Sequence, residues 1–180
     1  LRVIGNLPYN ISTPLIFHLL AQADAISDMT FMLQKEVVER LTASPGTRDW
    51  GRLSIMVQYH CQADYLFFVP PEAFSPPPRV DSAVVRLIPH DSPPHPADDE
   101  DHLRKLVAQA FTQRRKAIRN GLKSWVSAEQ FQALGIDAGL RPDQLSVADY
   151  VALANISRPP ADVEDANAPH TEQGKGDNSQ

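Results

Sequence analysis

Short apolar runs alternate with helical patterns along the first half of the chain. Runs that are apolar and rich in β-branched or aromatic residues predict strands at residues 1–4, 28–33, 63–69 and 82–89. Segments with apolar residues at helical spacing predict helices at residues 12–20, 34–41 and 53–61. Strands that alternate with helices are typical of a doubly wound sheet, so we predict an α/β domain over residues 1–90.

The second half carries only helical patterns, which predict a small all-α domain over residues 102–157. Its first helix is expected to start at His102. Ser127 and Ser146 are expected to cap two later helices, because a serine hydroxyl accepts a hydrogen bond from the first helical turn. Ser12 is expected to cap the first helix of the α/β domain in the same way.

The charge is unevenly distributed. The chain has a net charge of −5, which by itself is atypical of a protein that binds nucleic acid. The net charges of successive segments are −1 for residues 1–90, −5 for 91–101, +5 for 102–160 and −4 for 161–180. The acidity therefore lies in a Pro- and Asp-rich linker at 91–101 and in a polar tail at 158–180, which we predict to be disordered. The helical region between them is basic.

Composition restricts the class of protein. Cys61 is the only cysteine, so no disulfide forms within the chain and a reducing cytoplasm is expected. No apolar run reaches the roughly 18 residues that a membrane span needs, and the N-terminus does not resemble a signal peptide. His90 and His95 have no matching ligand cluster, so we predict no metal site. We expect a monomer with no membrane partner.

The first predicted strand leads into Asn6, Leu7, Pro8 and Tyr9, with Gly5 expected to let the backbone turn close to a ligand. In an open α/β sheet, ligands bind at this end of the strands. Pro8 keeps Leu7 extended and aims its carbonyl outward. The Asn6 side-chain oxygen and the Leu7 carbonyl would then be two acceptors beside the Tyr9 ring, which suits the exocyclic amine of a nucleobase. The alternative is an ordinary strand-to-helix turn.

A second aromatic residue lies in a stiff loop. Residues 70–78 contain five prolines, which preclude regular structure. Phe74 lies inside this loop with no periodic pattern to explain it. It either fills an apolar gap under the loop or is a rigidly mounted ring that sandwiches a flipped-out base opposite Tyr9.

Seven basic residues and no acidic one lie between Asp101 and Glu129. Arg114, Arg115 and Lys116 follow a glutamine at a predicted helix break, which favours contact with phosphate groups. The alternative is a solvated helix face.

These segments resemble the ribosomal RNA adenine N6-dimethyltransferases, in particular their small-subunit branch, the KsgA/RsmA family. The matching runs are Gly-Asn-Leu-Pro-Tyr-Asn-Ile-Ser at 5–12, Met-Leu-Gln-Lys-Glu-Val-Val at 32–38, Gly-Arg-Leu-Ser at 51–54, the proline-rich run at 70–85 and Ala-Phe-Thr-Gln-Arg-Arg-Lys at 110–116. The likeness covers about residues 1–157, and the runs together are highly specific.

The resemblance implies a Rossmann-like, S-adenosyl-L-methionine-dependent methyltransferase domain followed by a small all-α domain. It implies that Asn6, Leu7, Pro8 and Tyr9 form the catalytic loop, that Asn6 also lies close to the cofactor, and that Tyr9 and Phe74 stack on the target adenine. The RNA-binding residues that it suggests are Lys35, Arg79, Arg114, Arg115, Lys116 and Arg119.

The implied reaction is dimethylation at N6 of two adjacent adenosines in a 3′-terminal hairpin loop of 16S rRNA, on an assembly intermediate of the small ribosomal subunit. One departure stands out: residues 1–100 contain no Gly-x-Gly cluster for the cofactor. We therefore expect that residues 1–90 are the C-terminal half of the methyltransferase domain and that Leu1 is a truncation point. The chain alone is expected to be inactive and poorly soluble, with an exposed strand edge.

Three other functions stay open. A large-subunit rRNA adenine methyltransferase of the antibiotic-resistance type shares the Asn-Leu-Pro-Tyr loop. A DNA adenine methyltransferase fits less well, because that class more often has two prolines in the loop. The third is a non-catalytic RNA-binding or ribosome-assembly module that acts through the basic helical domain.

Overall fold

The computed structural model describes residues 1–158, so the tail predicted at 158–180 lies outside the described residues except for its first residue. The strands are β1 (Arg2–Asn6), β2 (Asp28–Gln34), β3 (Cys61–Val69) and β4 (Ser82–Pro89). The helices are α1 (Ser12–Leu20), α2 (Lys35–Leu41), α3 (Arg52–His60), α4 (Glu100–Phe111), α5 (Ile118–Gly121), α6 (Ala128–Leu134) and α7 (Val147–Ile156). Short 3-10 turns lie at Ala23–Ala25, Pro71–Ala73 and Pro142–Gln144.

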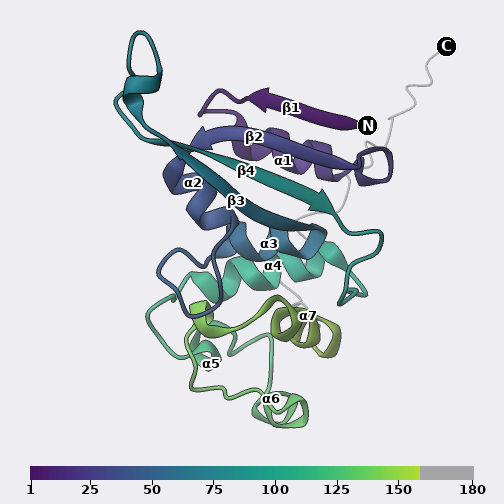
Figure 1. The fold of residues 1–180 in the computed structure, drawn as a ribbon. Coiled ribbons are helices and arrows are strands. Elements are labelled where there is room, and N and C mark those ends of the chain that lie inside the picture. The colour runs from purple at the N-terminus through teal and green to yellow at the C-terminus, as the bar shows by residue number, and fades with distance from the viewer. Residues whose placement is uncertain (159–180) are drawn as a thin grey trace, which may run out of the picture.

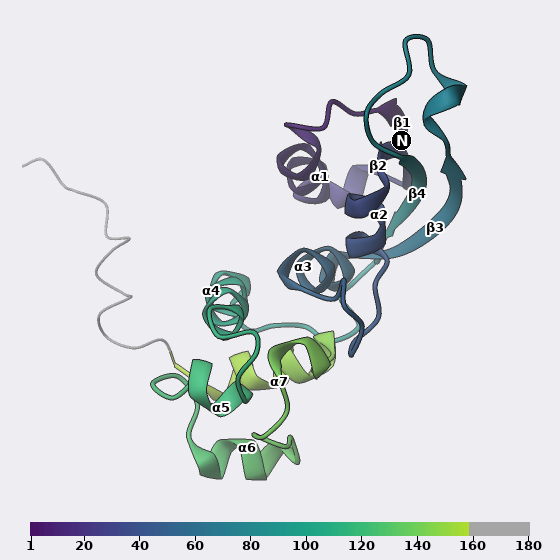
Figure 2. The same ribbon diagram turned by 90° about the vertical axis from the view of Figure 1, so that its left-hand side faces the viewer.

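The strands form one sheet in the order β1-β2-β4-β3. β1 and β2 are parallel and joined through α1, whereas β4 is antiparallel to both β2 and β3. Helices α1, α2 and α3 all pack on one face of this sheet, and the described residues leave its other face open (Figures 1 and 2). The predicted α/β class is confirmed, as is the helical domain that follows.

The apolar sequence of the strand predicted at residues 1–4 is typical of a buried strand, but this strand is only partly buried. Ile4 is 80% exposed and Leu1 is 76% exposed. The physical reason is the position of β1 at the edge of the sheet, where alternate side chains point to the open face. Apolar groups on the covered face are buried against the helices instead, as Met29, Phe31 and Leu33 of β2 are.

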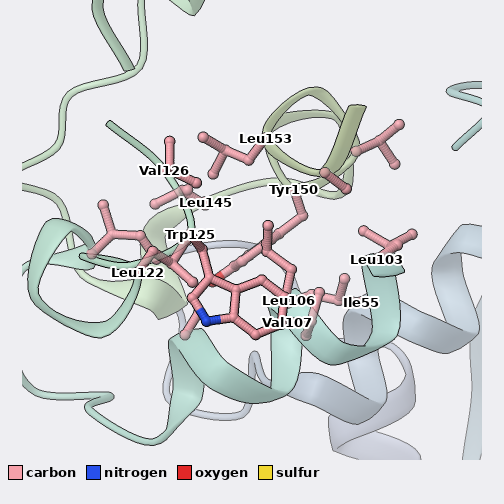
Figure 3. Packing of buried hydrophobic residues seen from close by; sticks show 14 of the residues in the cluster. Ile55, Leu103, Leu106, Val107, Leu122, Trp125, Val126, Leu145, Tyr150 and Leu153 are labelled. Atoms are coloured by element: carbon pink, nitrogen blue, oxygen red, sulfur yellow. The ribbon is translucent and has the colours of Figure 1, made fainter. Parts of the chain in front are cut away.

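The helical domain has its own apolar core, drawn in Figure 3, but α3 contributes to it. Ile55 and Tyr59 pack with the helical core, whereas Val57 and Cys61 pack with the sheet core. The two cores are therefore joined through α3, which buries apolar side chains in both, and are not separated at the linker.

Two predicted serine caps agree with the structure, whereas the predicted start of the helical domain and the predicted Ser12 cap do not. The helices predicted from residues 34 and 53 begin one residue away, at Lys35 and Arg52. Ser127 and Ser146 accept hydrogen bonds from Gln130 N and Asp149 N, which confirms both predicted caps. Helix α4 begins at Glu100 and not at His102, because the Asp99 carboxylate caps it and accepts bonds from two backbone N–H groups. The linker therefore ends at residue 99, two residues before its predicted end at residue 101.

Ser12 does not cap α1, which is the second difference. It is the first residue of that helix, is buried, and donates from Oγ to the Tyr9 carbonyl at 3.2 Å. The Ser12 hydroxyl therefore stabilises the preceding loop and does not cap the helix.

Candidate active site

The loop after β1 and the proline-rich loop between β3 and β4 lie side by side at one end of the sheet (Figures 1 and 2). Together they enclose a pocket of about 320 Å³, here called the Tyr9 pocket. Its lining residues are Asn6, Leu7, Pro8, Tyr9, Phe74, Pro76 and Pro78. Two aromatic residues that are 65 positions apart in the sequence therefore line the same cavity. If Phe74 stacks on a base opposite Tyr9, the two rings must line one cavity, as they do. If Phe74 only filled the space under its own loop, it would not have to lie near Tyr9.

Hydrogen bonding within the loop leaves two acceptors available. The Leu7 N–H donates to the Met32 carbonyl at 3.2 Å and the Ile11 N–H donates to the Pro8 carbonyl at 3.2 Å. The Tyr9 carbonyl accepts from Ser12. Within residues 1–158, the Asn6 side chain and the Leu7 carbonyl have no hydrogen-bond partner. Both residues line the Tyr9 pocket, and that their acceptors meet a ligand there stays a prediction.

The Tyr9 ring is held from its far end. Its hydroxyl lies 3.2 Å from Oγ of Ser82, a residue that is 1% exposed at the start of β4. Tyr9 itself is 41% exposed, so part of its surface is available to a ligand. Phe74 is half-buried.

Gly5 does not form the turn that the sequence suggests. It lies inside β1, paired with Phe31 of β2. A Cβ at this position would lie 3.4 Å from the Leu7 side chain and 3.8 Å from the Phe31 ring. These are ordinary van der Waals distances, so the packing beneath the loop would accommodate an alanine at this position.

Among the described residues, no carboxylate, imidazole, amine or thiol lines the Tyr9 pocket, whose walls are an amide, a phenol, a phenyl ring and apolar groups. The buried Cys61 thiol donates to the Val57 carbonyl, and burial raises its pKa to about 12, so it is not a nucleophile. The nearest match to an acid–base pair is His60 and Glu100, 3.7 Å apart, and it lies outside this pocket. Chemistry in the pocket must therefore rest on positioning.

Lys35 and Arg79, both suggested as RNA contacts, lie near the same end of the sheet. Lys35 begins α2 directly after β2, and its N–H donates to the Asp81 carbonyl at 2.9 Å. Its ammonium group lies 3.5 Å from Glu39 and 5.6 Å from the centre of the Phe68 ring. Arg79 is exposed in the proline-rich loop.

The basic cluster (Arg114, Arg115, Lys116 and Arg119) divides into two kinds of residue. Arg114 donates to the carbonyls of Arg48 and Trp50 and lies 3.8 Å from Asp143, so it joins the two domains. Arg114 therefore has a structural role, and its predicted contact with phosphate stays a prediction. The other three members are exposed, and none forms an ion pair within the described residues.

A larger groove of about 1260 Å³ lies between the sheet domain and the helical domain. Its lining has as many acidic residues as arginines. The arginines are Arg40, Arg48, Arg52, Arg104 and Arg114, and the acidic residues are Glu36, Glu39, Asp49, Glu100 and Asp101. Sequence reasoning missed the first three arginines, because they come from segments in which acidic residues are equally frequent. Only the packing of α2 and α3 beside α4 gathers them with Arg104 and Arg114.

Two kinds of feature are absent from residues 1–158. No three His, Cys, Asp or Glu side chains lie close enough together to bind a metal ion. No described helix combines the length and the hydropathy that crossing a bilayer requires.

Comparison with known proteins agrees with this geometry. A family described as Ribosomal RNA adenine dimethylase matches residues 1–158. The Ribosomal RNA small subunit methyltransferase A of Alcanivorax borkumensis is 99% identical over all 180 residues, which make up 64% of that protein. The protein of the same name in Pseudomonas aeruginosa is 64% identical over 155 residues, 86% of this chain and 58% of the relative. The chain thus spans less than two thirds of these relatives.

Solved structures show the same fold. A dimethyladenosine transferase from Plasmodium falciparum superimposes with a TM-score of 0.74 at 26% identity, over 84% of this chain and 64% of that one. The 23S rRNA methyltransferase ErmE superimposes with a TM-score of 0.67 at 23% identity, over 85% of this chain and 63% of that one, which shows a shared fold. The sheet domain therefore has the Rossmann-like fold of these methyltransferases, and the chain belongs to the ribosomal RNA adenine dimethylase family.

Proposed function

We propose that this chain is part of an enzyme that uses S-adenosyl-L-methionine to dimethylate N6 of two adjacent adenosines in a 3′-terminal hairpin loop of small-subunit (16S) rRNA. One observation carries the proposal: Asn6 and Leu7, whose acceptors have no partner within residues 1–158, line the same pocket as the aromatic residues Tyr9 and Phe74. The near-identity to a small-subunit methyltransferase supports the choice of RNA.

The pocket matches adenine group by group. A flipped-out adenine has two π faces, which Tyr9 and Phe74 would cover. Its exocyclic amine has two hydrogens, one for Asn6 Oδ1 and one for the Leu7 carbonyl. Both bonds favour a pyramidal nitrogen, whose lone pair is withdrawn from the ring and becomes nucleophilic. Stacking and orientation then replace a strong base, in agreement with the absence of any carboxylate or imidazole from the pocket walls.

Each transfer forms one bond from nitrogen to carbon and breaks one bond from carbon to sulfur, and the nitrogen loses one proton to solvent. S-adenosyl-L-methionine supplies the methyl group as a sulfonium. After the first transfer one N–H remains, so a single acceptor suffices for the second.

The residues present fit the cofactor in part. Asn6 ends β1, at the edge where α/β sheets bind ligands, and its side chain is exposed there. The described residues offer no glycine-rich turn for the cofactor, and residues 1–100 contain no Gly-x-Gly sequence. Asn6 is therefore the residue of this chain that we assign to the cofactor, and its other contacts belong to the remainder of the longer protein.

The RNA would extend from the pocket across the basic surfaces. Lys35 and Arg79 lie beside the pocket, and Arg115, Lys116 and Arg119 are exposed on the helical domain. Phosphate contacts of this kind position the substrate, whereas the pocket selects the base. We propose a small-subunit assembly intermediate as the substrate particle, a monomer as the active form and the cytoplasm as the location.

Methyl transfer by the full-length protein tests the proposal. Labelled S-adenosyl-L-methionine is supplied with unmethylated small subunits or large subunits, and the RNA is digested to nucleosides. We expect label in N6,N6-dimethyladenosine from small-subunit RNA alone. Label in large-subunit RNA would favour the antibiotic-resistance type of enzyme, and tight binding without transfer would favour an assembly module.

A further inference from the structure

Ser82 connects the two sides of the Tyr9 pocket. Its backbone pairs with Val69 of β3 and with Gln34 of β2, so a neighbouring strand holds it on each side. It is 1% exposed, and its Oγ lies 3.2 Å from the Tyr9 hydroxyl. A buried hydroxyl between two strands has little freedom to move and makes a firm anchor.

The same residue also forms the base of the loop that carries Phe74. Val69 and Ser82 are paired across β3 and β4, and the proline-rich loop runs from one to the other. The Lys35 N–H holds the last residue of that loop by its bond to the Asp81 carbonyl at 2.9 Å. One strand end therefore supports Phe74 through the chain and Tyr9 through a hydrogen bond.

We infer that Ser82 is a positioning residue that holds the Tyr9 ring at a fixed separation from Phe74. This inference rests on the proposed function and assigns a role to a residue that lies outside the pocket lining. Tyr9 is 41% exposed and lies in a loop, so without the anchor its ring would sample other rotamers. With this hydrogen bond, the space between the two rings is formed before the RNA binds. Less side-chain conformational entropy is then lost on binding.

The test uses the full-length protein with Ser82→Ala, Ser82→Thr, Tyr9→Phe and the Ser82→Ala/Tyr9→Phe double variant. Ser82→Ala and Tyr9→Phe each remove the same neutral hydrogen bond, so each is expected to lower kcat about two- to tenfold. KM for the RNA should stay within about twofold, because phosphate contacts dominate binding. Ser82→Thr keeps the hydroxyl and suits a strand, so it should restore kcat.

The double variant gives the sharpest result. If both changes remove one bond, the double variant is no slower than either single variant. Tyr150→Phe is the matched control, since it removes a buried phenol bond to the Pro142 carbonyl in the helical domain. That variant should lose stability and keep kcat.

A second measurement does not depend on activity. Carbon-13 labelling of the tyrosine rings allows NMR relaxation to report the order of the Tyr9 ring, assigned by its loss in Tyr9→Phe. We expect a less ordered ring in Ser82→Ala, and an unchanged one in Ser82→Thr and Tyr150→Phe. An equally ordered ring in Ser82→Ala, additive losses of kcat, or no rescue by threonine would overturn the inference. If the unaltered protein transfers no methyl group, the proposed function fails, and ring order still decides the role of Ser82.

Discussion

The indole Nε1 of Trp50 donates a hydrogen bond of 2.8 Å to the Leu145 carbonyl, which joins residues 95 positions apart. Trp50 lies in the loop before α3 and is 1% exposed, and Leu145 precedes α7 and is fully buried. Arg114 reinforces the junction by donating to the Trp50 carbonyl at 3.4 Å. The sheet domain and the helical domain therefore share this contact as well as α3, and we expect them to unfold together.

Trp50→Phe should destabilise the chain by about 1–3 kcal/mol, because it leaves the buried Leu145 carbonyl without a donor. Urea unfolding followed by far-ultraviolet circular dichroism measures the change. Trp125→Phe is the control, since the indole of Trp125 donates no hydrogen bond within the described residues. Equal losses in the two variants would show that the bond adds little to the packing.

Tyr9→Ala and Phe74→Ala should each lower methyl transfer by the full-length protein roughly 5- to 150-fold, since base stacking on one aromatic ring contributes about 1–3 kcal/mol. Phe67→Ala is the control, because Phe67 is 55% exposed but does not line the pocket. The assay is single-turnover transfer to small subunits. If Phe74→Ala is as active as Phe67→Ala, Phe74 does not stack on the base and only fills the apolar gap under its loop.

Removing exposed members of the basic cluster should weaken RNA binding and reduce its dependence on salt. Each of Arg115→Ala and Lys116→Ala should lower the slope of log affinity against log salt concentration by about 0.7–0.9. Arg114→Ala should also lower the stability of the free protein, because it removes the contacts to Trp50 and Arg48. Filter binding at several salt concentrations, beside urea unfolding, separates the two effects. An unchanged slope in both exposed variants would rule out direct phosphate contact.

His102 should make stability depend on pH. It is buried, its Nε2 lies 2.9 Å from the Ser157 hydroxyl, and its Nδ1 has no hydrogen-bond partner within residues 1–158. Burial lowers the pKa of the ring, an effect that the charges of Asp99 and Asp101 oppose and that of Lys105 supports. The folded pKa lies below the unfolded value of about 6.5, so stability is complete above that pH and falls as pH drops towards the folded pKa.

His102→Phe should therefore flatten the change in urea midpoint between pH 7.5 and pH 5, while keeping the ring that stacks on Trp125. The rest of the sequence is identical in the two proteins, so the difference between the two curves isolates His102. Parallel curves would show that its protonation does not matter to folding.

The open face of the sheet should promote association of the 180-residue chain. Ile4 and Phe67 are exposed on β1 and β3, and β1 has an unpaired edge within residues 1–158. Ile4→Thr should reduce self-association in sedimentation velocity. Ile11→Thr, at a residue that is 46% exposed near α1, should not. Equal effects would point to general hydrophobicity and not to this face.

The local pattern determined most elements of the fold. Apolar spacing located the strands and most of the helices, because strand and helix periods differ, and β4 agrees with its prediction at both ends. The caps at Ser127 and Ser146 depend only on bonds within four residues, so they too could be predicted. Helix α5 (Ile118–Gly121) was missed because one helical turn has no detectable period.

The order of residues in the Asn6–Tyr9 loop was also sufficient to suggest two acceptors beside an aromatic ring. That prediction followed from the fixed geometry of proline, which acts on its immediate neighbour. It did not require knowledge of distant residues.

Only the tertiary structure decided which distant residues meet. In the structure, Phe74 lines the same pocket as Tyr9, and Ser82 is the hydrogen-bond partner of the Tyr9 hydroxyl. Arg40, Arg48 and Arg52 line a groove between the sheet domain and the helical domain. The tertiary structure also turned Arg114 towards the carbonyls of Arg48 and Trp50. These pairings depend on strand order and on the packing of α3 between two cores. Such relations arise from burial of apolar surface across the whole chain, and no short window of sequence contains them.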